Sequence, residues 1–263
     1  MNISPVLISL KTASAAILVT FFIGLLAAGL VARIQRREWK MILDGILTLP
    51  LVLPPTVAGF FLLYIFGVRG PVGKFFLDFF SVRIAFSWGA AVLASTAISF
   101  PLMYRSTRGA LEQVDPNLIY AARTLGMSEW AVFFKVSLPT AMPGVASGAV
   151  LAFARGLGEF GATAMIAGNI AGKTRTLPLA IYSSVAAGDM ETAYGYVLII
   201  LLVSFIVVAL MNYFTALEKD SKKINRRTHG RRKFSVRNSG LHSCLFVSFA
   251  AIFIQGIFCG AAW

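Results

Sequence analysis

Residues 168–178, with the sequence GNIAGKTRTLP, combine glycine, lysine and threonine in a way that could bind phosphate. A nucleotide-binding P-loop has the pattern G-x-x-x-x-G-K-[ST], because its backbone N–H groups and its lysine surround the phosphates of the nucleotide. Only three residues separate Gly168 from Gly172 here, so the segment is one residue short of that pattern. A P-loop also follows a strand and opens a helix in an α/β domain. The elements around this segment therefore decide what it does.

Those elements are apolar. The chain of 263 residues is 57% hydrophobic and only 13% charged, whereas soluble domains carry about 25% charged residues. A membrane-spanning helix needs about 20 mostly apolar residues. The sequence therefore predicts an all-α, polytopic transmembrane helical bundle with five core spans. The spans are expected at residues 5–32, 42–68, 84–104, 141–168 and 192–217, with residues 241–263 as a sixth candidate.

Basic residues indicate how this bundle is oriented. Lys and Arg concentrate in residues 33–40, 105–135 and 219–237, which five spans place on one side of the membrane. The positive-inside rule makes that side cytoplasmic and the N-terminus external. Residues 168–178 then face away from cytoplasmic ATP, which disfavours nucleotide binding. The net charge of +13 is better explained by this bias and by anionic lipid than by nucleic acid.

The predicted organisation has three parts. Residues 1–217 form the transmembrane domain with a cytoplasmic loop at 105–139, residues 218–240 form a basic cytoplasmic linker, and residues 241–263 form a hydrophobic tail long enough to span. The linker is expected to be either irregular or a helix extension. Both cysteines and both histidines lie beyond residue 217. Residues 1–217 therefore lack a thiol nucleophile, a histidine-based triad and a conventional zinc site, and no cofactor is expected.

The cytoplasmic loop contains YAARTLGMSEWAVFFKVSLP at residues 120–139. Asp115 followed by proline predicts a helix start, and residues 117–125 are expected to be helical. Gly126 then permits a left-handed turn that ends the helix. The small side chains of Ala121 and Ala122 allow a partner surface to approach closely. The alternative is an amphipathic helix that lies on lipid.

The spacing in this loop resembles the EAA loop of ABC importer membrane subunits, E-A-A-x3-G-x9-I-x-L-P. Tyr120 replaces the glutamate and Val136 replaces the isoleucine, whereas Leu138 and Pro139 match. Residues 153–182 and 49–63 narrow the resemblance to the membrane subunits of molybdate ABC importers. Sulfate-importing relatives usually have tyrosine where Phe160 stands. One departure is Ala171, where proline is expected in many relatives. The resemblance covers about residues 5–217.

This resemblance implies a plasma-membrane (inner-membrane) permease that is not itself an enzyme. Two copies of an ATP-binding subunit would dock on the loop, and an extracytoplasmic binding protein would deliver molybdate or tungstate. The chain would work as a homodimer. The alternatives are a sulfate or thiosulfate permease of the same fold and, less favoured, a membrane-embedded enzyme or a scaffold. The residues implied in ATPase coupling are Asp115, Ala121, Ala122, Gly126, Leu138 and Pro139.

Two ionisable residues fall within the predicted fourth span. Arg155 and Glu159 are four residues apart, so they share a helix face and can pair. They either fix helix packing or place a carboxylate near the translocation path, where it would favour release of an oxyanion. Their pairing would leave a weak anion site. The candidate path and gate residues are Thr56, Phe60, Arg155, Glu159, Phe160 and Thr163.

Two external basic residues oppose the overall charge bias. Lys173 and Arg175 lie in the segment at residues 168–178. They are candidates for contacting acidic groups on the binding protein, and lipid headgroups are the alternative partner.

Overall fold

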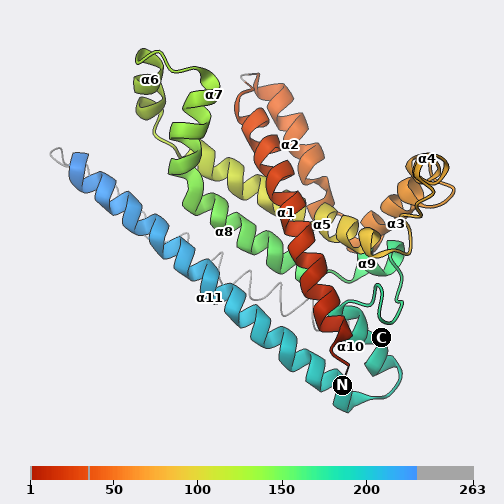
Figure 1. Cartoon of the computed structure of the whole chain (residues 1–263). Helices are drawn as coiled ribbons and strands as arrows, with labels where there is room; N and C mark the ends of the chain where they lie inside the picture. Colours follow the sequence, from red (N-terminus) through yellow and green to blue (C-terminus); the bar gives the residue numbers. More distant parts are fainter. Residues whose placement is uncertain (1, 35, 230–263) are drawn as a thin grey trace. The chain divides into compact units, whose positions relative to one another are not determined.

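A computed structural model describes residues 2–34 and 36–229, and the regular elements within these ranges are all helices (Figure 1). The chain divides into two compact units, residues 1–220 and 221–263. The described part of the second unit is the end of a long helix. The all-α prediction is therefore confirmed. The candidate sixth span at 241–263 lies outside the described residues.

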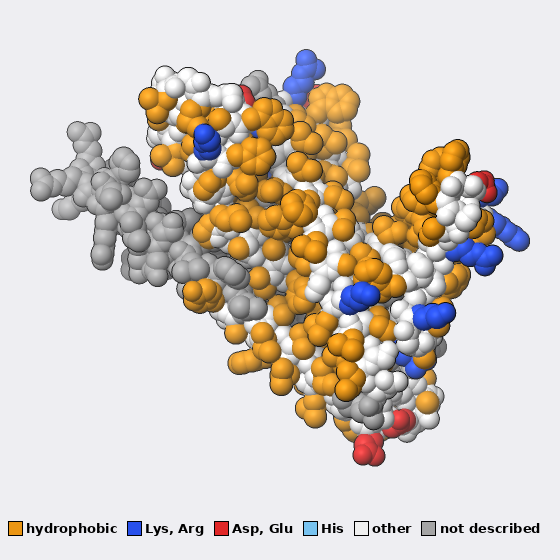
Figure 2. Space-filling model, in the orientation of Figure 1, with side chains coloured by type: hydrophobic (Ala, Val, Ile, Leu, Met, Phe, Trp, Pro, Cys, Tyr) orange, Lys and Arg blue, Asp and Glu red, His pale blue; other side chains and the backbone are white. Residues whose placement is uncertain are grey.

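The number of five core spans is not confirmed by the length and composition of the helices. In the described residues, three helices are long and apolar enough to cross a membrane, or up to four if a bent pair counts as one span. The three are Ser4–Ala32, Glu129–Leu157 and Met190–Ala209. Figure 2 shows hydrophobic side chains over much of the visible face, as a lipid-facing surface requires.

Helix α1 (Ser4–Ala32) agrees with the first predicted span and packs on α5 (Trp88–Glu112) and α8 (Leu138–Leu157). Its buried face carries small residues such as Ala16, Gly24 and Ala28. A Cβ atom at Gly24 would lie 2.8 Å from Cγ of Met103 on α5. Small residues thus bring the backbones together, as is usual between membrane helices.

The predicted span at 42–68 is not one continuous helix. It is two helices, α2 (Arg37–Val52) and α3 (Pro55–Phe66), whose axes are bent by 108°. Leu53 and Pro54 are extended at the break. Each precedes a proline, and the proline ring disfavours the helical conformation of the residue before it. Successive prolines therefore break the helix instead of only kinking it.

The predicted span at 141–168 is also divided. Helix α8 ends at Leu157, and a separate short helix, α9 (Gly161–Ile166), follows. Glu159 lies in the break and Thr163 on α9, so neither shares a helix with Arg155. Glycines at 156 and 158 weaken helix propensity at this point. A loop then leads to α10 (Leu177–Ala186) and α11 (Met190–His229). Helix α11 continues past residue 217 into the predicted linker.

Polar residues join α2 to α5. Tyr104 donates a hydrogen bond to the Asp44 carboxylate, which also pairs with Arg108. Arg108 Nε lies 3.0 Å from Oε1 of Glu112, and Lys40 Nζ lies 2.8 Å from the same oxygen. Four charged residues and a tyrosine therefore hold the two helices together.

The chain between α5 and α8 forms α6 (Pro116–Thr124), α7 (Glu129–Val132) and a π-helical turn, η1 (Phe133–Ser137).

Candidate coupling and translocation sites

Helix α6 occupies the predicted helical part of the loop, one residue earlier than expected at each end. Asp115 Oδ1 accepts a hydrogen bond from the backbone N–H of Asn117 at 2.9 Å, which caps the helix. Gly126 has φ +77° and its N–H bonds to the carbonyl of Arg123 at 2.9 Å. Ala122 is buried and Ala121 is exposed. The helix therefore rests on the protein through one alanine and leaves the other available to a partner.

The middle of the loop is joined to itself and to α1. Arg123 forms a two-pronged ion pair with Glu129, at 2.8 and 3.0 Å, which joins α6 to α7. On α1, the Arg33 guanidinium stacks over the Trp130 ring at 4.3 Å from its centroid. A Cβ atom at Gly29 would lie only 3.1 Å from Phe133, so that ring fits against the α1 backbone. The contacts of Trp130 and Phe133 attach the loop to the end of α1.

Sequence reasoning missed Arg33 and Trp130. Arg33 lies in a basic segment that was interpreted only as an orientation signal, and nothing in its spacing pairs it with an aromatic residue 97 positions away. Leu138 and Pro139 begin α8, where Leu138 is half-buried against the helix core and Pro139 is exposed. The six predicted coupling residues thus lie on α6, at its two ends and at the start of α8.

Three of the candidate gate residues, Thr56, Phe60 and Thr163, lie on two helices that touch. Helices α3 and α9 pack closely because glycines face backbone at the contact. A Cβ atom at Gly59 would lie 2.7 Å from Cα of Ala162, and one at Gly161 would lie 3.2 Å from Thr56 N. This contact brings Thr56 and Phe60 on α3 near the first turn of α9.

Exposure separates the gate residues into two groups. Thr56 is exposed, as are Phe60 (54%) and Phe160 (38%), whereas Thr163 is fully buried. The Thr163 hydroxyl has no hydrogen-bond partner in the described part of the chain. The Phe160 ring packs against Tyr182 on α10, with centroids 5.4 Å apart. Tyr182 is a neighbour that the sequence pattern did not identify.

The expected pairing of Arg155 with Glu159 is present. Arg155 Nη1 lies 2.7 Å from Oε2 of Glu159, whose side chain is almost fully buried. The other carboxylate oxygen accepts a hydrogen bond from the backbone N–H of Ala162 at 2.9 Å. The carboxylate therefore joins the end of α8 to the first turn of α9, and both of its oxygens are occupied. Glu159 acts as the N-terminal cap that α9 otherwise lacks.

The segment at residues 168–178 is a self-contained turn. Gly168 and Gly172 both have left-handed backbones, with φ of +71° and +76°. The N–H groups of residues 173, 174 and 175 all point to the carbonyl of Ile170, at 3.0–3.1 Å. The buried Thr174 hydroxyl bonds to Ile170 N and the Gly168 carbonyl. Three backbone N–H groups and the threonine hydroxyl, which would bind phosphate and metal in a P-loop, are thus used within the turn.

The two basic residues that the sequence analysis places outside the membrane, Lys173 and Arg175, differ in their surroundings. Arg175 Nε donates to Oδ1 of Asn169 at 2.8 Å, and Asn169 donates in turn to the Ser183 hydroxyl on α10. Lys173 is exposed. Only Lys173 is therefore fully available for a contact outside the chain.

Comparison with known proteins finds relatives among the membrane subunits of transport systems. The family model of the binding-protein-dependent transport system inner membrane component matches residues 20–218. The molybdenum transport system permease protein ModB of Escherichia coli (strain K12) is 44% identical over 226 residues, which are 86% of this chain and 96% of that protein. ModB of Haemophilus influenzae is 44% identical and covers 73% and 83%. The sulfate transport system permease protein CysT of Escherichia coli (strain K12) is 36% identical and covers 72% and 68%.

Solved structures show the same fold at lower identity. A bacterial alginate ABC transporter in complex with its alginate-bound periplasmic protein has a chain with a TM-score of 0.66 and 15% identity, covering 82% of this chain and 79% of its own. The inward-facing MetNI methionine ABC transporter gives a TM-score of 0.60 at 20% identity, covering 80% and 94%. These likenesses establish the helical fold of ABC transporter membrane subunits.

Proposed function

Since this chain belongs to the family of binding-protein-dependent transport system inner membrane components, we propose that it forms the membrane path of an ABC importer for molybdate. The chain is a permease subunit and not an enzyme. The assignment of molybdate as the substrate rests on the 44% identity to the molybdenum permease over 96% of that protein. ATP hydrolysis is assigned to a separate partner subunit, and substrate capture to an extracytoplasmic binding protein.

The coupling step is assigned to α6. In a homodimer, two ATPase subunits would each hold one α6, with Ala121 and Gly126 at the contact. Closure of the ATPases on ATP would displace the loop as one piece, because Arg123–Glu129 and Arg33–Trp130 hold it together. The displacement would pass into α1 through Arg33 and into α8 through the continuous chain of η1 and Leu138. The N-terminus is external in this arrangement.

The translocation step is assigned to the contact of α3 with α9. Thr56 and Phe60 would line the path with Phe160, whose packing on Tyr182 links it to α10. Glu159 is neutralised by Arg155 and turned into the protein. The pair therefore supplies no strong anion site, which suits a path that releases molybdate after delivery. Lys173 is assigned to contact with the binding protein.

Sulfate is the second candidate cargo, because the sulfate permease CysT is also a relative at 36% identity. Sulfate and molybdate are both tetrahedral dianions, so charge alone does not separate them. The higher identity and coverage of the molybdenum permeases favour molybdate.

The test is anion uptake into vesicles that contain this chain, its ATPase and its binding protein. Molybdate uptake should require ATP and persist in excess sulfate. The variant Gly126→Val should lose ATPase binding, because a β-branched residue is strained at φ +77°. Gly109→Ala is the control, since a Cβ there meets nothing within 4 Å. Equal uptake of sulfate would overturn the molybdate assignment, and normal ATPase binding by Gly126→Val would overturn the role of α6.

A further inference from the structure

A short amphipathic helix, α4 (Pro71–Phe80), follows α3 and has three distinct faces. One face packs on the preceding turn, where a Cβ atom at Gly73 would lie 1.9 Å from the Gly67 carbonyl oxygen. A second face carries Lys74 and Asp78, both exposed. The third face is aromatic and is partly or largely exposed. Its residues are Phe75 (51%), Phe76 (37%), Phe79 (75%) and Phe80 (62%).

The aromatic face is ordered along the helix. Phe75 lies over Phe79 with ring centroids 4.7 Å apart, and Phe76 lies over Phe80 at 5.7 Å. Figure 2 shows the hydrophobic cluster over this helix with basic and acidic side chains at its edge. Four exposed phenylalanines on ten residues form an apolar surface that water does not favour.

Three cations lie on α4 or next to it in the chain. Arg69 precedes α4, Lys74 lies on it and Arg83 follows it, and all three are exposed. Within the described residues none of the three forms an ion pair, and Asp78 is the single acidic residue between residues 69 and 83. The segment thus has a net charge of +2 next to its apolar surface.

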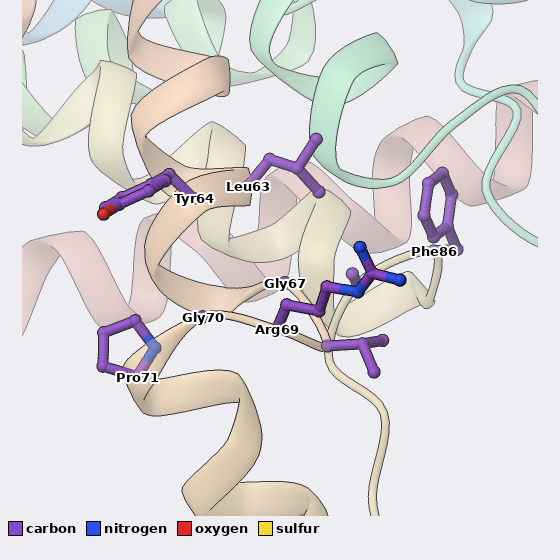
Figure 3. Close-up of a pocket in the computed structure, with 9 residues that line it drawn as sticks. Leu63, Tyr64, Gly67, Arg69, Gly70, Pro71 and Phe86 are labelled. Carbon is purple, nitrogen blue, oxygen red and sulfur yellow. The ribbon is translucent and has the colours of Figure 1, made fainter.

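A pocket lies beside the start of the helix. It has a volume of about 430 Å³ and is lined by residues of the α3 end, the α3–α4 turn and the segment before α5. Figure 3 shows the Arg69 side chain extending across it toward Phe86, with Leu63 and Tyr64 above and Pro71 on the far side. The lining is mostly apolar and the Arg69 guanidinium is its one charged group, a combination that suits a phosphate group attached to hydrocarbon.

We propose that α4 lies in the membrane interface with its aromatic face in the lipid, and that Arg69, Lys74 and Arg83 bind the phosphate of anionic phospholipids. An apolar face flanked by Lys and Arg is the pattern of helices that lie in the plane of the interface. The charges also disfavour a second copy of this chain as the occupant. A twofold contact places the same patch on both sides, so each set of three cations would face its equivalent.

Lipid contact at the aromatic face is the first measurement. A fluorophore is attached through Phe79→Cys in a Cys244→Ser, Cys259→Ser background, and the chain is placed in nanodiscs. One set contains phosphatidylcholine and the other an equal mixture with phosphatidylglycerol. We expect strong quenching by a phospholipid with a nitroxide near its headgroup and weak quenching by aqueous iodide. Strong quenching by iodide with none by the lipid would overturn the proposal.

Lipid charge is the second measurement, made with the same label and a nitroxide-bearing phosphatidylglycerol. The combined variant Arg69→Gln, Lys74→Gln, Arg83→Gln should reduce the preference for this lipid over its phosphatidylcholine counterpart by roughly fivefold or more. The control variant Arg36→Gln, Arg37→Gln, Lys135→Gln removes three cations elsewhere and should leave the preference unchanged. An equal preference in both variants would contradict the assignment, as would a disulfide between two copies of the unlabelled Phe79→Cys chain. Neither measurement depends on transport.

Discussion

The buried Glu159 carboxylate and the Arg155 guanidinium lie 2.7 Å apart across the end of α8. Glu159 also holds the N–H of Ala162 in the first turn of α9. One side chain therefore neutralises a cation, caps a helix and joins the two helices on either side of a break in the chain. Arg155 is the more exposed partner, with 30% of its side chain accessible, against 1% for Glu159.

This difference predicts unequal effects when either partner is removed. Arg155→Met should lower the free energy of unfolding by about 3–5 kcal/mol, because it leaves a buried carboxylate without its cation. Glu159→Gln should cost only about 1 kcal/mol, since the amide oxygen still accepts hydrogen bonds and Arg155 reaches water. Thermal unfolding in nanodiscs measures both. Equal losses in the two variants would mean that the ion pair does not determine stability here.

The close approach of α3 to α9 predicts that an added methyl group at this contact lowers the stability of the protein. Gly59→Ala places a methyl group 2.7 Å from Cα of Ala162 and 2.9 Å from Cβ of Met165. The helices must separate, at a cost of about 1–3 kcal/mol. Gly45→Ala on α2 is the matched control, because a Cβ there meets nothing within 4 Å and alanine favours a helix by up to about 1 kcal/mol. Denaturation curves should move in opposite directions. A shared direction would contradict the packing at Gly59.

These helices show where the sequence was sufficient and where it was not. Hydropathy and length predict α1 almost to the residue, because a long apolar helix needs no long-range information. They fail at residues 42–68 and 141–168, where an apolar run spans two helices. An apolar composition indicates that a segment avoids water, but it does not indicate where the helix axis changes direction. The prolines at 54 and 55 mark the place of the break, but its size of 108° cannot be read from the sequence.

In the candidate sites, too, local features were predictable from the sequence and long-range contacts were not. The cap at Asp115 and the left-handed Gly126 are local features, so their residue types and spacing were enough to predict them. The pairing of Arg155 with Glu159 was also predicted, because four residues suffice to bring the charges together. The hydrogen bond from Ala162 to Glu159 required the helix to end at Leu157. Contacts such as Arg33 with Trp130 depend on the tertiary structure, and a single sequence contains no signal for them.

The ion-pair cluster between α2 and α5 predicts a loss of stability at Arg108. Arg108→Met should cost about 2–3 kcal/mol, less than a fully buried pair, because 25% of the Asp44 side chain is accessible. Arg105→Met on the same helix is the control and should stay within about 0.5 kcal/mol, as Arg105 is exposed. Equilibrium unfolding of the two variants compares them directly. A similar loss at Arg105 would assign the effect to charge in general and not to the cluster.

The start of α11 predicts a dependence on pH. The side chain and then the backbone N–H of Thr192 donate hydrogen bonds to Asp189, which holds the pKa of that carboxyl below its usual value. The ionised carboxylate therefore stabilises the first turn above the usual aspartate pKa of about 3.9, and this stabilisation is lost as the pH falls through the lowered pKa. Asp189→Asn keeps an amide cap but does not ionise.

Amide hydrogen exchange in the first turn of α11, corrected for the intrinsic rate at each pH, measures this difference. At about pH 6 the wild-type turn should be better protected than that of Asp189→Asn, because only the carboxylate carries the charge that the helix N-terminus favours. The two should converge as the pH falls below about 3.9 and the carboxyl takes up its proton. A difference that stays constant with pH would show that the shape of the cap, and not its charge, protects the turn.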